Sequence, residues 1–110
     1  MNERRQSARF PTGLHLEVQD RDSPRRLGRV VDLTREGFLL FGEHPAETDS
    51  VWRCRLVLVE PLAGIADIQL DAECLWNRPG ADGRHCWAGF HITGLAEDQA
   101  AALDTLLRLL

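Results

Sequence analysis

The side chains with the most recognisable chemistry lie in two short patterns near the start of the chain. Arg5 and Arg9 stand four residues apart, and Asp32, Thr34 and Gly37 form an Asp-x-Thr-x-x-Gly segment further on. A guanidinium is planar, permanently charged and forked, so it can clamp a phosphate, bond the O6/N7 edge of guanine or stack on a base. A carboxylate accepts hydrogen bonds from the guanine N–H donors, which an arginine cannot do. Together the two patterns suit a small ligand that carries both phosphates and guanines.

The order of the two patterns is more informative than either one alone. Arg-x-x-x-Arg also occurs at Arg21 and Arg25, so its spacing is weakly specific, whereas Asp-x-Ser/Thr-x-x-Gly occurs once. The Arg5–Arg9 pair precedes the first predicted strand, and Phe10-Pro11 ends this segment in extended form. The prediction of a ligand with phosphates and guanines therefore rests on both patterns together: a basic pair before the first strand and an acidic turn after the second.

In this order, ahead of a strand-rich domain, the two patterns resemble the ligand signature of PilZ domains, bacterial receptors for cyclic di-GMP. The resemblance implies that Arg5 and Arg9 contact the phosphates and the guanines, and that Arg4 adds a third contact. It implies that Asp32 accepts from guanine N1–H and N2–H while Thr34 offers a hydroxyl. The family usually has Ser where this chain has Thr34, which keeps the hydroxyl and adds a methyl group.

Each candidate residue also has a structural interpretation. Asp32, Thr34 and Gly37 are types that any tight turn between strands favours, for local hydrogen bonds and for positive φ. Both interpretations hold together if the turn presents Asp32 to the ligand. Trp76 lies near the end of a predicted inward-facing strand, so core packing and a stacking platform at the barrel rim are equally open. Trp52 is expected in the core.

The spacing of apolar residues predicts six strands and one helix. Alternation indicates strands near Leu14–Val18, Leu27–Leu33, Phe38–Phe41, Val51–Val59, Ile68–Trp76 and Cys86–Ile92, with a turn at Pro61–Gly64. Leu103, Leu106, Leu107 and Leu110 recur at helical spacing, which predicts a helix over about 96–110. Short antiparallel strands are best satisfied by a closed barrel. The expected fold is mainly β: a six-stranded antiparallel PilZ-type β-barrel with a C-terminal α-helix over its open end.

Composition narrows the classes of function. The chain has 110 residues, a formal net charge of -4 and no lysine, which indicates one domain. Residues 1–35 hold eight Arg against five acids, and residues 36–110 hold five Arg against twelve. This pattern suits one anionic ligand at one place and argues against DNA as a partner. The polar start and the lack of a long apolar run predict a cytoplasmic protein without membrane insertion.

No catalytic or metal-binding motif stands out. The three cysteines lack C-x-x-C spacing, and Cys86 and His91 fall on opposite faces of their predicted strand, so no metal site is expected. Neither a nucleophile motif nor a paired set of catalytic carboxylates is present. The chain is therefore not expected to be an enzyme or to hold a cofactor, and its ligand would be cyclic di-GMP.

The predicted organisation is a flexible Arg-rich arm over 1–11 and a barrel with its helix over 12–110. Ligand phosphates would draw Arg5 and Arg9 down beside Asp32 and order the arm, and the signal would pass to an unidentified effector protein. One alternative is a PilZ-like protein-interaction module that binds no nucleotide. A single-stranded nucleic-acid binder ranks last, because it needs aromatic and basic residues interleaved on one sheet face, and the most regular outward face is acidic.

Overall fold

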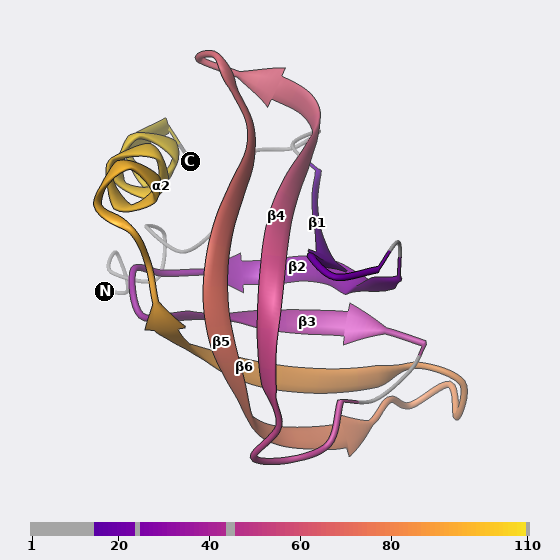
Figure 1. The fold of residues 1–110 in the computed structure, drawn as a ribbon. Helices are drawn as coiled ribbons and strands as arrows, with labels where there is room; N and C mark the ends of the chain where they lie inside the picture. The colour runs from indigo at the N-terminus through magenta and orange to yellow at the C-terminus, as the bar shows by residue number, and fades with distance from the viewer. Residues whose placement is uncertain (1–14, 24, 44–45, 110) are drawn as a thin grey trace, which may run out of the picture.

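The computed structural model describes residues 15–23, 25–43 and 46–109, so Arg4, Arg5, Arg9 and the expected arm over 1–11 lie outside the described residues. Six strands are followed by one helix (Figure 1). Their bounds are β1 Leu16–Asp20, β2 Arg26–Leu33, β3 Gly37–Gly42, β4 Val51–Leu62, β5 Ile65–Pro79, β6 Cys86–Gly94 and α2 Glu97–Leu109.

The strands close into an antiparallel barrel in the order β1-β2-β3-β6-β5-β4. Each strand pairs with two neighbours, so the backbone donors and acceptors of all six strands face a partner strand rather than an open edge. The predicted fold, a six-stranded antiparallel barrel followed by one C-terminal helix, is confirmed.

The barrel interior is filled by small and medium-sized apolar side chains. Val18, Leu56, Ile68 and Cys74 are each 0% exposed, and they come from β1, β4 and β5. Every fully buried side chain among the described residues is hydrophobic. Because the inward positions alternate with outward ones along each strand, the predicted alternation correctly identified most of this core.

The hairpin between β4 and β5 is longer than the sequence predicted. Leu62 pairs with Ile65, so the turn is Ala63-Gly64 rather than Pro61–Gly64. Both turn residues have positive φ, 53° and 78°, as a two-residue hairpin turn requires. The hairpin therefore continues beyond the barrel body, at the top of Figure 1.

The first strand also differs from its predicted bounds: it begins at Leu16 and runs to Asp20, instead of ending at Val18.

A β-bulge corrects the predicted orientation of Trp76. In β5 the pairing with β6 shifts between Cys74 and Trp76, leaving Leu75 as the extra residue. A bulge breaks the two-residue alternation, so Trp76 points outward and is 36% exposed. The core interpretation of Trp76 is therefore wrong. Trp52, by contrast, is partly buried and packs against the core.

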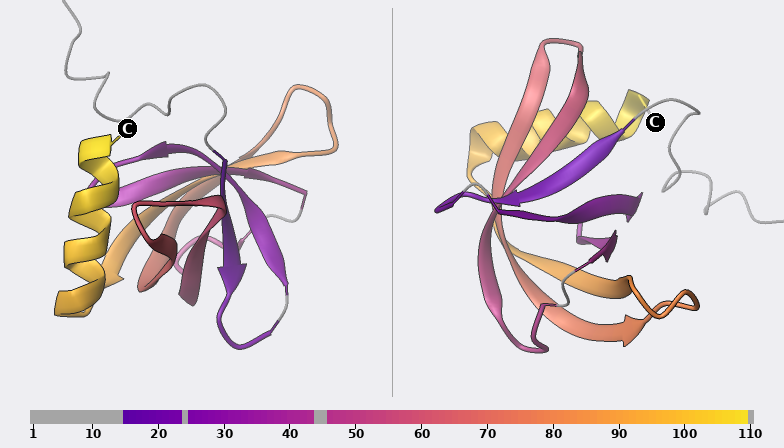
Figure 2. Two further views of the ribbon diagram at one scale, coloured as in Figure 1. Left: turned by 90° about the horizontal axis from the view of Figure 1, so that it is seen from above. Right: turned by 90° about the vertical axis from the view of Figure 1, so that its right-hand side faces the viewer.

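The helix packs its apolar stripe onto the barrel. Leu103 and Leu106 are 0% exposed and belong to the barrel core, and the Oε1 of Gln99 accepts the backbone N–H of Gln69 on β5 at 2.8 Å. Figure 2 shows α2 alongside the strand ends on one side of the barrel. Within the described ranges, no helix has the length and apolar character needed to cross a membrane.

Candidate functional site

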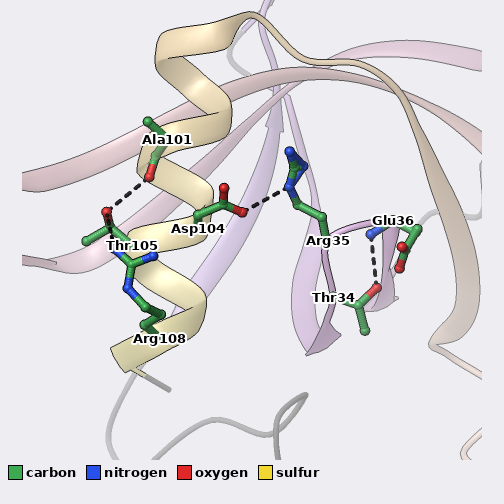
Figure 3. A network of polar contacts seen from close by, with 7 residues as sticks. All are labelled: Thr34, Arg35, Glu36, Ala101, Asp104, Thr105 and Arg108. Carbon is green, nitrogen blue, oxygen red and sulfur yellow. Dashed lines mark hydrogen bonds and ion pairs between the residues drawn. The ribbon is translucent and has the colours of Figure 1, made fainter.

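The turn between β2 and β3 is held by its own threonine. The backbone N–H of Thr34 donates to the carbonyl of Gly37 at 2.9 Å. Its Oγ1 accepts from the backbone N–H groups of Glu36 at 3.3 Å and Gly37 at 3.2 Å, and Figure 3 shows the first of these bonds. This is the local hydroxyl-to-backbone pattern of a threonine turn. The structural role expected of Thr34 is therefore present.

Gly37 is required by close packing rather than by backbone conformation. It is not among the residues with positive φ, so the expectation of positive φ at this position is wrong. A Cβ built on Gly37 would lie 2.2 Å from the carbonyl oxygen of Phe90, which belongs to the backbone of the paired strand β6. Only glycine allows the two strands to approach this closely.

Arg35, at the tip of the same turn, reaches away from the barrel to the helix. Its Nε donates to Oδ1 of Asp104 on α2 at 2.9 Å, as Figure 3 shows. The two side chains are 48% and 46% exposed. A hollow of about 330 Å³ lies between the turn and the helix, lined by Leu33, Leu107 and Arg108 in addition to this pair. The turn is thus tied to the barrel on one side and to α2 on the other.

Asp32 lies on the outer surface of the barrel, just before this turn. A bulge between Val30 and Asp32 shifts the pairing with β3, and Asp32 stands opposite Leu39. Its neighbour Leu33 is fully buried, so Asp32 faces outward. Among the described residues, no side-chain hydrogen bond or ion pair occupies its carboxylate. The carboxylate is therefore free, within this part of the chain, to accept from a ligand.

The strand register places Asp32 and Trp76 in one row across four strands. Asp32 pairs with Leu39 on β3, Leu39 with Gly89 on β6, and Gly89 with Trp76 on β5. Directly paired residues share a face of the sheet, so all four face outward. Three strand spacings separate the ends of the row, which is roughly 14 Å. We call the outward surface of β2, β3, β6 and β5 the outer face.

Trp76 is fixed on the outer face by a glycine. A Cβ on Gly89 would lie 2.3 Å from Nε1 of Trp76 and 2.6 Å from its Cε2, so the indole edge occupies the space that a side chain would need. On its ring, the Cζ of Arg78 lies 5.0 Å from the centroid. The indole is therefore held between the β6 backbone and an arginine, with part of its surface open to solvent.

A hollow of about 310 Å³ opens between the motif turn and the middle of the row. This volume is at the lower end of the range for small-ligand sites. The hollow brings three predicted site residues together, Asp32, Thr34 and Gly37, and adds Glu36, Leu39, Leu75 and His91 to its lining. Trp76 lies outside this lining, further along the row.

The described lining of the hollow is negatively charged, so cations from another part of the chain would have to neutralise a bound phosphate. Its described lining contains two carboxylates, Asp32 and Glu36, and no arginine, since Arg35 is turned to Asp104. Such a surface can accept from N–H donors but cannot neutralise a phosphate. The motif assigns this role to Arg5 and Arg9, which lie outside the described residues.

The barrel topology brings the start of the described chain to this place. β1 pairs antiparallel with β2, with Glu17 opposite Arg29 and Val18 opposite Gly28. Residues before Leu16 are therefore connected to the barrel at the end of β2 that carries Asp32. Arg9 precedes Leu16 by seven residues, which can span at most about 25 Å.

Among the described residues, the other reactive or titratable side chains do not form a second functional site. Within the described ranges, no group of His, Cys, Asp and Glu converges as a metal site would require. Burial raises the pKa of Cys54 to about 12, with Asp20 and Asp71 adding to the effect, so this thiol is unreactive at neutral pH. Hydrogen bonds from the backbone N–H groups of His85 and Arg84 hold the pKa of Asp82 well below its ordinary value.

The sequence analysis did not predict several residues of the outer face. Leu39 could have been found, because the alternation that buries Phe38 and Leu40 turns it outward. A glycine inside a strand is a signal of close approach, which applies to Gly89. That its partner is Trp76 depends on the bulge and on the pairing register, and neither can be read from one strand alone.

Comparisons with known proteins agree with this geometry at the level of the fold. In solved structures, the chain resembles MrkH, titled a c-di-GMP dependence transcription regulatory factor, with a TM-score of 0.69 and 12% identity over 92% of this chain and 47% of that one. It resembles the Bacillus subtilis inhibitor of motility, MotI/DgrA, with a TM-score of 0.67 and 13% identity over 92% of this chain and 48% of that one. The K. pneumonia MrkH–c-di-GMP complex gives a TM-score of 0.67 and 13% identity over 91% and 48%.

The chain spans about half the length of each of these structures. No match is found among curated proteins. A family model described as the PilZ domain matches residues 3–109, nearly the whole chain. With both motifs inside the matched range and a closed six-stranded barrel beneath them, the chain belongs to the PilZ domain family.

Proposed function

We propose that this chain is a cytoplasmic receptor for cyclic di-GMP that binds the ligand on the outer face and signals to a partner protein. Asp32 accepts from the guanine N–H donors, the turn of Thr34 and Gly37 shapes the hollow, and Trp76 stacks on a base. Arg5 and Arg9 supply the positive charge for the phosphates, with Arg4 as a third contact. The structural similarity to MrkH supports cyclic di-GMP as the ligand, since MrkH has been solved in complex with c-di-GMP.

The observation that carries this proposal is the row from Asp32 to Trp76. A carboxylate without a partner among the described residues and an exposed aromatic ring lie on one face, joined by Leu39 and Gly89. A guanine needs an acceptor for its N1–H and N2–H and a flat surface for its ring. The described lining of the hollow contains no arginine or lysine, so we assign the phosphates to Arg5 and Arg9, which precede β1 in the sequence.

The first test is isothermal titration calorimetry of the full chain with cyclic di-GMP, using GTP and cyclic di-AMP as controls. Saturable binding of cyclic di-GMP alone supports the receptor, and the stoichiometry counts the ligand molecules. No binding would contradict the proposal and would favour the alternative, a PilZ-like interaction module that binds no nucleotide.

Variants locate the site within that experiment. Arg5→Ala/Arg9→Ala and Asp32→Asn each remove hydrogen bonds to charged groups, so each should weaken binding about 10-fold or more. Arg53→Ala is the matched control, because Arg53 is exposed on β4, outside the outer face. Normal binding by the double arginine variant would contradict the site assignment.

A single-stranded oligonucleotide belongs in the same series. A single-stranded nucleic-acid binder needs aromatic and basic residues interleaved on one sheet face, and such a row does occur: Arg29, Phe41, Trp87 and Arg78 follow one another in a second row of the outer face. Tighter binding of the oligonucleotide than of cyclic di-GMP would replace the receptor with a single-stranded nucleic-acid binder.

The signalling step is proposed to be the ordering of residues 1–11 over the bound ligand, which creates a surface for the partner. Hydrogen exchange measures this directly. Saturating cyclic di-GMP should protect amides in residues 1–11, and the Arg5→Ala/Arg9→Ala variant at the same ligand concentration serves as the control. Unchanged exchange in this segment at full occupancy would contradict the switch while leaving the binding proposal intact.

A further inference from the structure

Arg78 is an exposed cation on the outer face next to the candidate site, and it is held in an unusual way. Its guanidinium lies over the ring of Trp76, with Cζ 5.0 Å from the centroid. Among the described residues, Arg78 takes part in no ion pair. Several other outward arginines are paired with carboxylates, including Arg26 with Glu17 and Arg55 with Asp67. A ring, and not an acid, positions the guanidinium of Arg78.

This placement leaves the binding capacity of the guanidinium unused. An arginine has five N–H donors and a flat face that stacks on rings, and a contact with an indole uses only one side of that face. The opposing charge of a carboxylate would have consumed two of the donors. Arg78 therefore combines a fixed orientation with donors and one planar side that are still available.

The ring that holds Arg78 is itself held rigidly. The indole edge of Trp76 lies against the backbone at Gly89, where any side chain would collide with it. Across the sheet, Arg78 pairs with Trp87, and Trp87 contacts Phe41, whose ring centroid is 4.6 Å away. The guanidinium thus lies over Trp76 on β5, on a strand whose neighbour β6 carries the aromatic pair of Trp87 with Phe41 of β3.

The register links this arrangement to the candidate site. Trp76 is in the row that begins with Asp32, and Arg78 is two residues further along the same strand and faces the same way. A base placed against the exposed part of Trp76 would therefore lie close to the guanidinium as well as the indole. The indole and the guanidinium are both planar, so either can stack on the planar ring of guanine.

We propose that Trp76 and Arg78 form one composite platform on which a guanine of cyclic di-GMP stacks, with Arg78 in direct contact with the base. The inference rests on the function proposed above and deepens it, because it adds a ligand contact that neither motif contains. Arg78 is thereby a stacking residue: the open side of its guanidinium plane lies against the base, while its N–H donors point outward within that plane.

The test compares three variants of the full chain by calorimetry with cyclic di-GMP: Arg78→Ala, Arg78→Lys and Arg84→Ala. Arg84 is exposed in the β5–β6 turn and forms no side-chain ion pair among the described residues, so it controls for the loss of one charge. Arg78→Ala should weaken binding about 5- to 150-fold, the range that stacking of one base is worth. Arg84→Ala should bind like the unaltered chain.

Arg78→Lys separates stacking from charge. Lysine keeps the charge but has no planar group, so this variant should bind nearly as weakly as Arg78→Ala. Thermal unfolding of each variant should stay within a few degrees of the unaltered chain, because the substituted side chain is on the surface.

The outcomes that overturn the inference differ from those that overturn the proposed function. Failure of the unaltered chain to bind cyclic di-GMP would remove both. Normal binding by the unaltered chain, together with equal or tighter binding by Arg78→Ala, would remove this inference alone and show that Arg78 only covers the indole. Full affinity in Arg78→Lys would mean that charge, and not a stacked plane, is what the ligand requires.

Discussion

At the scale of single residues, two glycines shape the outer face by having no side chain. Gly37 lets β3 approach the Phe90 carbonyl, and Gly89 makes room for the indole of Trp76. The consequences of adding a methyl group differ. At Gly89 the obstacle is a side chain, which can move, whereas at Gly37 it is the backbone of a paired strand, which can move only if the sheet does.

We expect Gly37→Ala to lower the free energy of unfolding by about 1–3 kcal/mol, the usual cost of overpacking. Urea unfolding followed by far-UV circular dichroism measures it. Gly94→Ala is the matched control, because its Cβ would meet the flexible carboxylate of Asp71, at 2.8 Å from Oδ2. Equal losses in the two variants would show that the Phe90 contact is not what demands glycine at position 37.

A second residue-scale prediction concerns pH. Backbone N–H groups of His85 and Arg84, and then the His85 ring, hold the pKa of Asp82 below its ordinary value. A carboxylate with a lowered pKa stabilises the fold above its unfolded-state pKa of about 3.9 and loses that contribution as pH falls through the folded-state value. The Tm of the unaltered chain should therefore exceed that of Asp82→Asn at pH 5, and the difference should shrink toward pH 2.5.

The same comparison with Asp49→Asn provides the control. Among the described residues, the side chain of Asp49 accepts no hydrogen bond, and its backbone has a positive φ of 71°, a conformation that asparagine tolerates well. A Tm difference for Asp82→Asn that does not change between pH 5 and pH 2.5 would contradict the assigned cause.

At the scale of elements, one ion pair connects the motif turn to the helix. Arg35 and Asp104 join segments 69 residues apart in the chain, and no other hydrogen bond between side chains of the described residues links the β2–β3 turn to α2. A movement of the turn relative to α2 would therefore strain or break this contact. Since both side chains are about half exposed, solvent weakens the pair and leaves it easy to break.

We expect a coupling energy of about 0.2–1 kcal/mol between Arg35 and Asp104, the range of exposed ion pairs. A double-mutant cycle with Arg35→Gln and Asp104→Asn, followed by urea unfolding, measures it. The pair Arg53 and Asp22, 3.6 Å apart and more exposed, is the control and should give a smaller value. The Arg35–Asp104 coupling should also decrease at 1 M salt, and an increase would exclude an ionic origin.

At the scale of the whole molecule, the barrel and the helix share one core. Leu103 and Leu106 of α2 are as fully buried as Leu16, Leu33 and Leu70 of the strands. The helix thus contributes to the core beneath the outer face, so we expect loss of its packing to destabilise the strands.

Leu106→Ala should lower the free energy of unfolding by about 2–5 kcal/mol, as cavity formation in a core does. Leu109→Ala, one turn on and 45% exposed, should change it far less. Chemical denaturation monitored by tryptophan fluorescence and by circular dichroism should give coincident transitions. A separate early transition in the Leu106→Ala circular dichroism would show that α2 folds independently of the barrel.

Much of this architecture is determined by local sequence. Alternation over Val51–Val59 and over residues 68–74 fixes which face is buried, and the leucine spacing in α2 fixes its apolar stripe. The Asp-x-Thr-x-x-Gly turn follows from side chains that bond their own backbone. These features depend on neighbours within a few residues, so the sequence predicts them. The two motifs also identified the family.

The tertiary structure decided how separate strands align. The bulge at Leu75 turns Trp76 outward, and the register then places it in line with Asp32, with Gly89 beneath it and Arg78 over its ring. The same holds for Gly37, whose reason is a carbonyl more than fifty residues away. A shift of one residue in strand pairing reverses every face, and pairing is set by the packing of the whole barrel. Local pattern therefore determined the strands, the turn and the helix, and only the closed barrel determined which of their side chains meet.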